Sequence, residues 1–205
     1  MISDKDRSGY IGASDTAFVM RNWNTKTFEN WWRVKQGIAV NNLSTYAMMA
    51  GTAYEHKILD ALNIPGMEKD KQIIKGRLRV NLDGNTSSKI YEVKTHKADK
   101  PFKVSTGYRM QVNVEMYASG IRDACIVAYA LDEKDYCNYF REIDSERLSF
   151  HPILYDQEFI GEYEKRLLYL SMCLENGVFP QEGAVWMQGI GNVKSITRDF
   201  ITGKA

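Results

Sequence analysis

The 205-residue chain is 44% hydrophobic and 12% aromatic, which allows a packed core and excludes disordered, collagen-like and low-complexity proteins. Its three cysteines are odd in number and show no Cys-x-x-Cys spacing, which argues against a disulfide scaffold, a zinc ribbon or an iron–sulfur cluster. The net charge of +1 conceals a basic middle, with eleven Lys/Arg against four Asp/Glu between Lys69 and Arg109, and an acidic segment, with twelve Asp/Glu against five Lys/Arg between Asp132 and Glu182.

The N-terminal region of the chain predicts three helices. A short helix covers 14–20 with Ser14 as its N-cap, and a second helix covers 27–36 and ends near Gly37. Trp31 and Trp32 lie on this second helix, where aromatic side chains usually belong to the core and less often stack on DNA bases. A longer helix covers 44–62 and ends before Asn63, Pro65 and Gly66.

The middle and C-terminal regions predict strands and two further helices. Apolar and polar residues alternate over 78–83, the stretch 84–88 forms a turn, and a returning strand covers 89–95. Next we expect a helix over 107–119, strands over 124–130 and 136–143, and a helix over 155–176. This order indicates an α/β fold with a small mixed central sheet flanked by helices. We predict one domain over 1–205, with a tail from about 181 that is loosely ordered or packs between subunits.

The sequence predicts neither a signal peptide nor a membrane span. The N-terminal residues contain no apolar segment of the signal-peptide type, and the longest apolar run, 124–131, is much shorter than a membrane span. We therefore expect a cytoplasmic protein without a membrane partner. The basic middle either faces a nucleic-acid backbone or is an ordinary solvated surface.

Two carboxylates and one ammonium are predicted to meet on the hairpin. Asp83 ends the first strand on its polar face, and Glu92 and Lys94 share one face of the returning strand. Neighbouring carboxylates resist ionisation unless a cation lies between them, and such hard oxygen ligands suit Mg²⁺ or Mn²⁺. The simpler alternative is a cross-strand ion pair on a solvated hairpin.

Glu55 is a third acidic group of interest. Met48, Thr52, Glu55, Leu59 and Leu62 recur at helical spacing, which places Glu55 within an apolar stripe. A carboxylate facing a core needs a partner, a proton or a metal, so Glu55 is either a buried salt-bridge residue or a third acidic group of the metal site. Met48 on the same stripe is either a core residue or an apolar wedge that helps to separate the strands of a DNA duplex.

The ordered set Gly51-x-x-x-Glu55, Asp83-Gly84, Glu92-x-Lys94 and Gln111 resembles the PD-(D/E)xK nuclease superfamily. Within it, the chain is most similar to the phage lambda exonuclease and YqaJ viral-recombinase family, over roughly 7–120. Three local strings carry the same resemblance: Arg7-x(4)-Gly12-Ala13-Ser14-Asp15, Gly51-Thr52-Ala53-Tyr54-Glu55 and Tyr108-Arg109-Met110-Gln111-Val112. Leu82 stands where the family has a proline, and Asn81 where the lambda enzyme has a serine.

The resemblance implies a role for each matching residue. Asp83 and Glu92 hold the metal, Lys94 positions or activates water, and Glu55 adds an acidic group that binds the metal directly or through water. Gln111 belongs in the cleft near the terminal phosphate. The remaining matches are assigned to DNA and to the 5′ phosphate: Arg7, Ser14, Asn81 and Gln111.

The function implied is a Mg²⁺- or Mn²⁺-dependent, 5′-to-3′ double-stranded DNA exonuclease of phage or prophage recombination, which hydrolyses phosphodiesters with a metal-activated water. The resemblance also implies a cyclic homo-oligomer, a trimer around DNA, a single-strand annealing protein as partner, and the bacterial host cytosol. Two alternatives remain open: another PD-(D/E)xK enzyme of RecB-like or restriction-endonuclease type, and an inactive DNA-binding or assembly protein. His56, His96 and His151 show no metal-ligand spacing, and of these only His96 is a candidate for touching phosphate.

Overall fold

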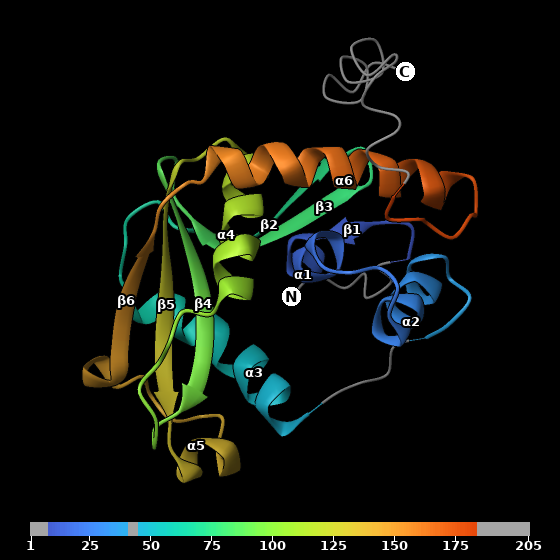
Figure 1. Cartoon of the computed structure of the whole chain (residues 1–205). Helices are drawn as coiled ribbons and strands as arrows, with labels where there is room; N and C mark the ends of the chain where they lie inside the picture. The colour runs from blue at the N-terminus through green and yellow to red at the C-terminus, as the bar shows by residue number, and fades with distance from the viewer. Residues whose placement is uncertain (1–7, 41–44, 184–205) are drawn as a thin grey trace. The chain divides into compact units, whose positions relative to one another are not determined.

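A six-stranded mixed sheet with helices is the framework of the protein, as the computed structural model shows for residues 8–40 and 45–183 (Figure 1). Hydrogen bonds join the strands in the order β1-β3-β4-β5-β6, and β2 pairs with β3. The predicted α/β class with a mixed central sheet is therefore confirmed. The chain divides into two compact units, described separately below, and the single domain over 1–205 stays a prediction.

The first unit contains the N-terminal elements, residues 72–81 and the segment from 156 onward. Its strand β1 (Ile11–Gly12) runs parallel to the first half of β3 (Leu78–Asn85). Its helices are the 3-10 turn η1 (Ala13–Asp15), α1 (Thr16–Met20), α2 (Lys26–Lys35) and α6 (Gln157–Glu175).

Aromatic packing fills the first unit. Trp31 and Trp32 are buried, and Trp31 stacks on Phe18 with 5.0 Å between ring centroids. Trp32 donates from Nε1 to the carbonyl of Val178. The core interpretation of both tryptophans is therefore confirmed, because neither ring is free to stack on a base.

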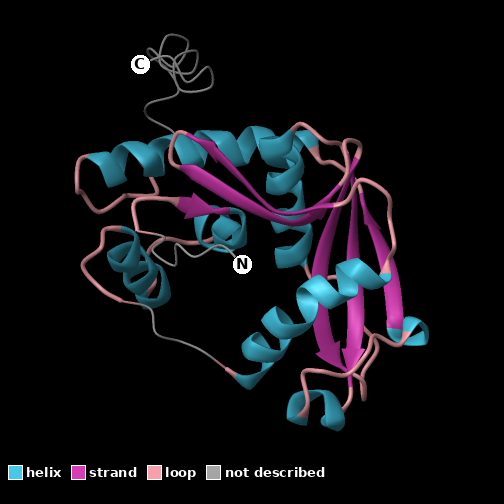
Figure 2. Cartoon of the chain, turned by 180° about the vertical axis from the view of Figure 1, so that it is seen from behind, coloured by secondary structure: helices cyan, strands magenta, loops and turns pink. Residues whose placement is uncertain are grey.

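The second unit, 42–71 and 82–155, carries most of the sheet. The strands β4 (Lys89–Lys97) and β5 (Asp123–Leu131) run parallel, and β6 (Leu148–Ile153) pairs antiparallel with β5. Helix α3 (Tyr46–Ala61) crosses one face of these strands (Figure 2), and α4 (Thr106–Ser119) lies on the other (Figure 1). Thr45 and Ser105 cap these two helices by accepting from the backbone N–H three residues later.

The side of the sheet under α3 is the hydrophobic core of the second unit. Tyr54 and Ile58 of α3 pack with Val93, Val127 and Tyr129, and all are buried. Because side chains alternate along a strand, burying Val93 on this side turns Glu92 and Lys94 toward α4. The apolar alternation of β4 and β5 thus decides where the polar residues collect.

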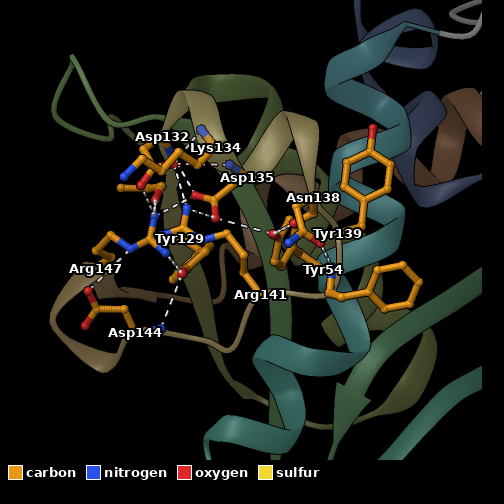
Figure 3. A network of polar contacts seen from close by, with 12 residues as sticks. Tyr54, Tyr129, Asp132, Lys134, Asp135, Asn138, Tyr139, Arg141, Asp144 and Arg147 are labelled. Atoms are coloured by element: carbon orange, nitrogen blue, oxygen red, sulfur yellow. Dashed lines mark hydrogen bonds and ion pairs between the residues drawn. The ribbon is translucent and has the colours of Figure 1, made fainter.

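A buried ion network ties the loop after β5 to α3 (Figure 3). Asp135, in the short helix α5 (Glu133–Cys137), is fully buried and pairs with Arg141 and Arg147, each at 2.6 Å. The Tyr54 hydroxyl donates to the carbonyl of Asn138 at 2.9 Å. This network fixes Tyr54, the residue directly before Glu55.

Several predicted elements are wrong. The strand expected over 136–143 is absent, and α5 and a loop cover these residues. The strand that follows β5 in the sheet is β6, which begins later, at Leu148. Asp132, which caps α5 from its side chain, starts a helix where the aromatic composition favoured a strand. The strand β2 (Glu68–Lys75) was not predicted, because its charged, largely exposed residues show no apolar alternation. The predicted tail lies mostly outside the described residues.

Ser14 is not the N-cap of its helix. It lies inside η1 with an exposed side chain, and Gly12 occupies the N-cap position. Asp15 takes over the capping, because its Oδ2 accepts from the backbone N–H of Gly12 at 2.8 Å while Lys35 pairs with the same oxygen. Within the described residues, no helix is long and apolar enough to cross a membrane.

Candidate active site

Asp83 and Glu92 are neighbours across the β3–β4 pair. Gly84 pairs with Tyr91 and Asn85 with Ile90, so Asp83 and Glu92 are the next residues along the antiparallel strands. The Oδ2 of Asp83 accepts from the backbone N–H of Val93 at 2.9 Å, which fixes the carboxylate beside β4. Glu92 is almost completely buried. The hairpin therefore places two carboxylates together, as the sequence predicts.

Lys94 and Gln111 hold one oxygen of Glu92. Lys94 pairs through Nζ with Glu92 Oε1, and Gln111 of α4 donates from Nε2 to the same atom at 2.6 Å. The second oxygen, Oε2, is buried and has no hydrogen-bond partner. An unpaired buried carboxylate oxygen is unfavourable by itself, and a cation would stabilise it.

Glu115 is a further acidic group that was not predicted from the sequence. It lies one helical turn after Gln111 on α4, is fully buried, and accepts from Gln111 Nε2 at 2.9 Å. Its Oε2 also lacks a partner. The spacing Gln111-x-x-x-Glu115 was the only available signal, since residues four apart share a helix face.

Glu55 stands at the edge of this group, next to His56 and Asp70. One ligand atom from each of the three lies within 4.8 Å of the others, and His56 Nε2 is 2.9 Å from Asp70 Oδ2. His56 was expected to face away from Glu55, because adjacent helix residues diverge. The unpredicted strand β2 supplies Asp70, and both side chains turn toward it.

Burial and mutual repulsion govern the protonation of these carboxyls. Burial, together with the charges of Glu92 and Glu55, raises the pKa of Asp83 well above its ordinary value. Burial and the charge of Glu92 do the same to the pKa of Glu115, and also raise the pKa of Glu55. Burial would lower the pKa of Lys94, but Glu92 and Asp83 outweigh it and raise that pKa, so Lys94 is a cation at neutral pH.

The donor set fits a hard divalent cation. Asp83, Glu92 and Glu55 offer carboxylate oxygens, which Mg²⁺ and Mn²⁺ prefer over nitrogen or sulfur. Among the described residues, however, the group whose ligand atoms all lie within 4.8 Å of one another is Glu55, His56 and Asp70, and the three predicted metal carboxylates are not that close together. Two observations are compatible with this fit: the partnerless Oε2 of Glu92, and the raised pKa values, which arise from burial first and from neighbouring carboxylates second. A divalent cation would relieve both.

The α3 residues fit the predicted stripe only incompletely. Leu59 is buried, but Met48 is 53% exposed and Thr52 is exposed, so the buried stripe runs instead through Ala50, Tyr54 and Ile58. The core interpretation of Met48 is thus wrong, because more than half of this residue is exposed. Gly84, within β3 rather than in the predicted turn, allows close packing, since a Cβ there would lie 2.7 Å from Leu59 Cδ2.

Of the residues predicted to bind the 5′ phosphate, Gln111 lies in this site, where it contacts Glu92. Arg7 lies outside the described residues. Ser14 and Asn81 belong to the first unit, whereas Asp83, Glu92, Lys94, Gln111, Glu55 and Met48 belong to the second. Their roles at a 5′ phosphate stay predictions.

The protein is similar to known proteins in its structure. No family model matches the chain, and no curated protein matches it in sequence. The fold is similar to an alkaline exonuclease from Laribacter hongkongensis (LHK-Exo), with a TM-score of 0.63 and 20% identity over 83% of this chain and 90% of that one. A structure of LHK-Exo in complex with dAMP matches equally well.

A second similar structure is a phage-related exonuclease from Haemophilus somnus 129PT, with a TM-score of 0.58 and 13% identity over 82% of this chain and 94% of that one. At these identities the likeness shows the fold. The nuclease fold that the sequence motifs implied is thereby confirmed.

Proposed function

We propose that the protein is a divalent-metal-dependent DNA exonuclease that degrades one strand of a duplex from its 5′ end. The observation that carries the proposal is the assembly of Asp83, Glu92 and Lys94 on one sheet face, with Glu92 Oε2 left without a partner. The similarity of the fold to LHK-Exo and to the phage-related exonuclease supports it.

In this proposal, the carboxylates of the site bind the cation, and Lys94 and Gln111 position the carboxylate and the phosphate. Asp83 and Glu92 would hold the metal, with Glu55 as an additional acidic group. When bound, the cation neutralises phosphate charge and lowers the pKa of water. Gln111 and Lys94 occupy Glu92 Oε1, which keeps Oε2 available to the metal.

Lys94 contributes a positive charge that the surrounding carboxylates maintain. Because its pKa is raised, the ammonium donates hydrogen bonds, either to the attacking water or to a phosphate oxygen. Phosphodiester hydrolysis breaks the bond to the 3′ oxygen and leaves a 5′ phosphate on each released nucleotide. In this proposal, Asp83 holds the cation, and Lys94 orients the attacking water or the phosphate and offsets the negative charge of the phosphate.

The finer features of the proposal follow the sequence resemblance. Arg7, Ser14 and Asn81 would hold a terminal 5′ phosphate, for which an arginine fork and short donors are suited. We propose a cyclic trimer around DNA, a single-strand annealing protein as partner, and the bacterial cytosol as the location. Sedimentation would test the ring, which should have three times the 23.5 kDa mass of one chain.

The test is digestion of matched DNA substrates with Mg²⁺ or EDTA. Linear duplex with a 5′ phosphate should release mononucleotides in Mg²⁺, whereas covalently closed circular plasmid should stay intact. Cutting of the closed circle would indicate an endonuclease of the same fold instead. Absence of hydrolysis on every substrate, with DNA binding retained, would indicate an inactive DNA-binding protein.

A further inference from the structure

We propose that four aromatic side chains beside the candidate active site form a stacking surface for a nucleobase of the bound DNA strand. These are His96, Phe102, Tyr108 and His151, called here the Phe102 cluster. The inference rests on the proposed function and extends it: Asp83, Glu92 and Lys94 act on the phosphate, while the Phe102 cluster binds a neighbouring base.

The rings of the Phe102 cluster are arranged around one central side chain. Phe102 and Tyr108 are nearly parallel, at 9°, with 6.0 Å between centroids. The imidazole of His96 is 5.4 Å from the Phe102 centroid and that of His151 is 5.0 Å from it. The four side chains come from the end of β4, the β4–α4 connection, the first turn of α4, and β6.

The cluster is continuous with the site through Tyr108 and Lys94. The Lys94 ammonium lies over the Tyr108 ring, 5.2 Å from its centroid. Tyr108 and Gln111 are three residues apart on α4, which places them on one side of the helix. A strand whose phosphate lies at Lys94 therefore has an aromatic surface within the length of a single nucleotide.

The register of the sheet places the cluster on the same face as the catalytic carboxylates. Glu92 pairs with Ile126, and Ile126 pairs with His151, so Glu92 and His151 project on one side. His96 follows Lys94 by two residues on β4 and shares that side. The hydrophobic core, with Val93 and Val127, is on the opposite side.

Burial and charge around the cluster suit a nucleic-acid strand. All four rings are partly exposed, whereas the aromatic residues of the core, such as Tyr54 and Tyr129, are fully buried. Four exposed basic residues lie in the segment that carries Phe102 and Tyr108: Lys97, Lys100, Lys103 and Arg109. Partly exposed rings with basic residues beside them are the combination by which proteins hold single strands without sequence preference.

The test measures binding with hydrolysis switched off. A short single-stranded oligonucleotide with a 5′ phosphate and a 3′ fluorophore is titrated in EDTA, and a second one is abasic at its first three nucleotides. Replacing the ring by Phe102→Leu should weaken binding of the intact oligonucleotide about tenfold, within the range of roughly 5 to 150-fold for one base–aromatic stack. Binding of the abasic oligonucleotide should not change.

Two further variants make the result specific. Phe102→Tyr keeps the ring and should keep the parental affinity. Phe150→Leu is the matched control, because Phe150 is a 54% exposed aromatic residue of β6 paired with Val127 and so lies on the other face. Equal affinity of Phe102→Leu and the parent, or an equal loss on both oligonucleotides, would overturn the proposal.

A cross-linking measurement on the unaltered protein covers the case in which Phe102→Leu fails to fold. Oligonucleotides carrying 5-iodouracil near the 5′ end should cross-link to peptides containing Phe102 or Tyr108, and a cross-link only to other peptides would overturn the proposal. Hydrolysis of linear DNA in Mg²⁺ is measured on the same preparation. If the parent protein hydrolyses DNA but shows no base stacking, only the proposal about the Phe102 cluster is refuted. If the parent protein does not hydrolyse DNA, the proposed function is refuted as well.

Discussion

Gln111 donates its amide to Glu92, with Nε2 2.6 Å from Oε1, and the same nitrogen lies 2.9 Å from Oε1 of Glu115. One neutral amide thus donates to two buried acidic side chains on the face of the sheet under α4, and these two side chains also contact each other. It fixes the orientation of Glu92 and reduces the repulsion between Glu92 and Glu115. The arrangement explains why a glutamine, with donors and no charge, is suited to this position.

Gln111→Ala should lower the rate of DNA hydrolysis by about tenfold to a hundredfold, a range typical of losing one positioned group in a site. Gln111→Glu should lower it further and also lower the melting temperature, because a third carboxylate would face Glu92 and Glu115 without a donor. Single-turnover rates and melting curves measure both effects. Gln157→Ala, at an exposed position of α6, is the control and should change neither.

Asp83→Asn should stabilise the metal-free protein at pH 8, since it removes one of several crowded carboxylates. The folded-state pKa of Asp83 is raised, so its contribution to stability is present at acidic pH and is lost as the pH rises through that pKa. The melting-temperature gain of Asp83→Asn in EDTA should therefore grow from pH 5 to pH 8. Each kcal/mol corresponds to about 2–4 °C in a chain of this size.

In EDTA, Asp83→Asn should melt at a higher temperature than the parent protein at pH 8, and with Mn²⁺ the parent protein should melt at the higher temperature. The cation binds the ionised carboxylates, so the parent protein should gain more melting temperature at pH 8 than at pH 5, while Asp83→Asn gains little. A parent protein whose melting temperature does not respond to Mn²⁺ at either pH would contradict the proposed metal site.

Asp135→Asn should destabilise the second unit without touching the proposed site directly. The fully buried carboxylate pairs with Arg141 and Arg147, and breaking a buried pair costs up to about 3–5 kcal/mol. Asp144→Asn is the control: its side chain is 51% exposed and pairs with Arg147 at 3.5 Å, so the loss should stay below about 1 kcal/mol. Denaturant unfolding measures the difference, and equal losses would refute the assigned importance of Asp135.

Met48→Ala should leave the melting temperature nearly unchanged, because the side chain is 53% exposed. If Met48 is a wedge between strands, digestion of duplex ends should slow much more than digestion of single strands. Met49→Ala, at a 49% exposed position on the same helix, provides the comparison. Equal rates of Met48→Ala and the parent protein on duplex ends would rule out the wedge.

The sequence predicted the β3–β4 pair and α4 well because both carry strong local patterns. Alternation over 78–83 and the β-branched residues of the returning strand place Asp83, Glu92 and Lys94 together without tertiary information. The position of Gln111 follows from helix periodicity once α4 is known. In these regions of the site, neighbours in space are close in sequence.

The missed features depend on contacts that no local pattern records. Asp70 reaches Glu55 and His56 from β2, an exposed and charged strand defined by its partner β3. The segment after β5 is aromatic and reads as a strand, yet burial of Asp135 between two arginines holds it as a short helix and loop. Glu115 looked like one charged residue among many, because its burial is a property of the fold.

The most direct test of the proposed function compares Glu92→Gln with Glu142→Gln, a change at an exposed glutamate of the same unit. The measurement is the single-turnover rate of mononucleotide release from 5′-phosphorylated linear duplex in Mg²⁺, with DNA affinity measured in EDTA. Glu92→Gln should lose roughly a hundredfold to ten-thousandfold in rate while DNA affinity is retained, and Glu142→Gln should match the parent protein. Release of mononucleotides by Glu92→Gln at close to the parental rate would contradict the assignment of this site.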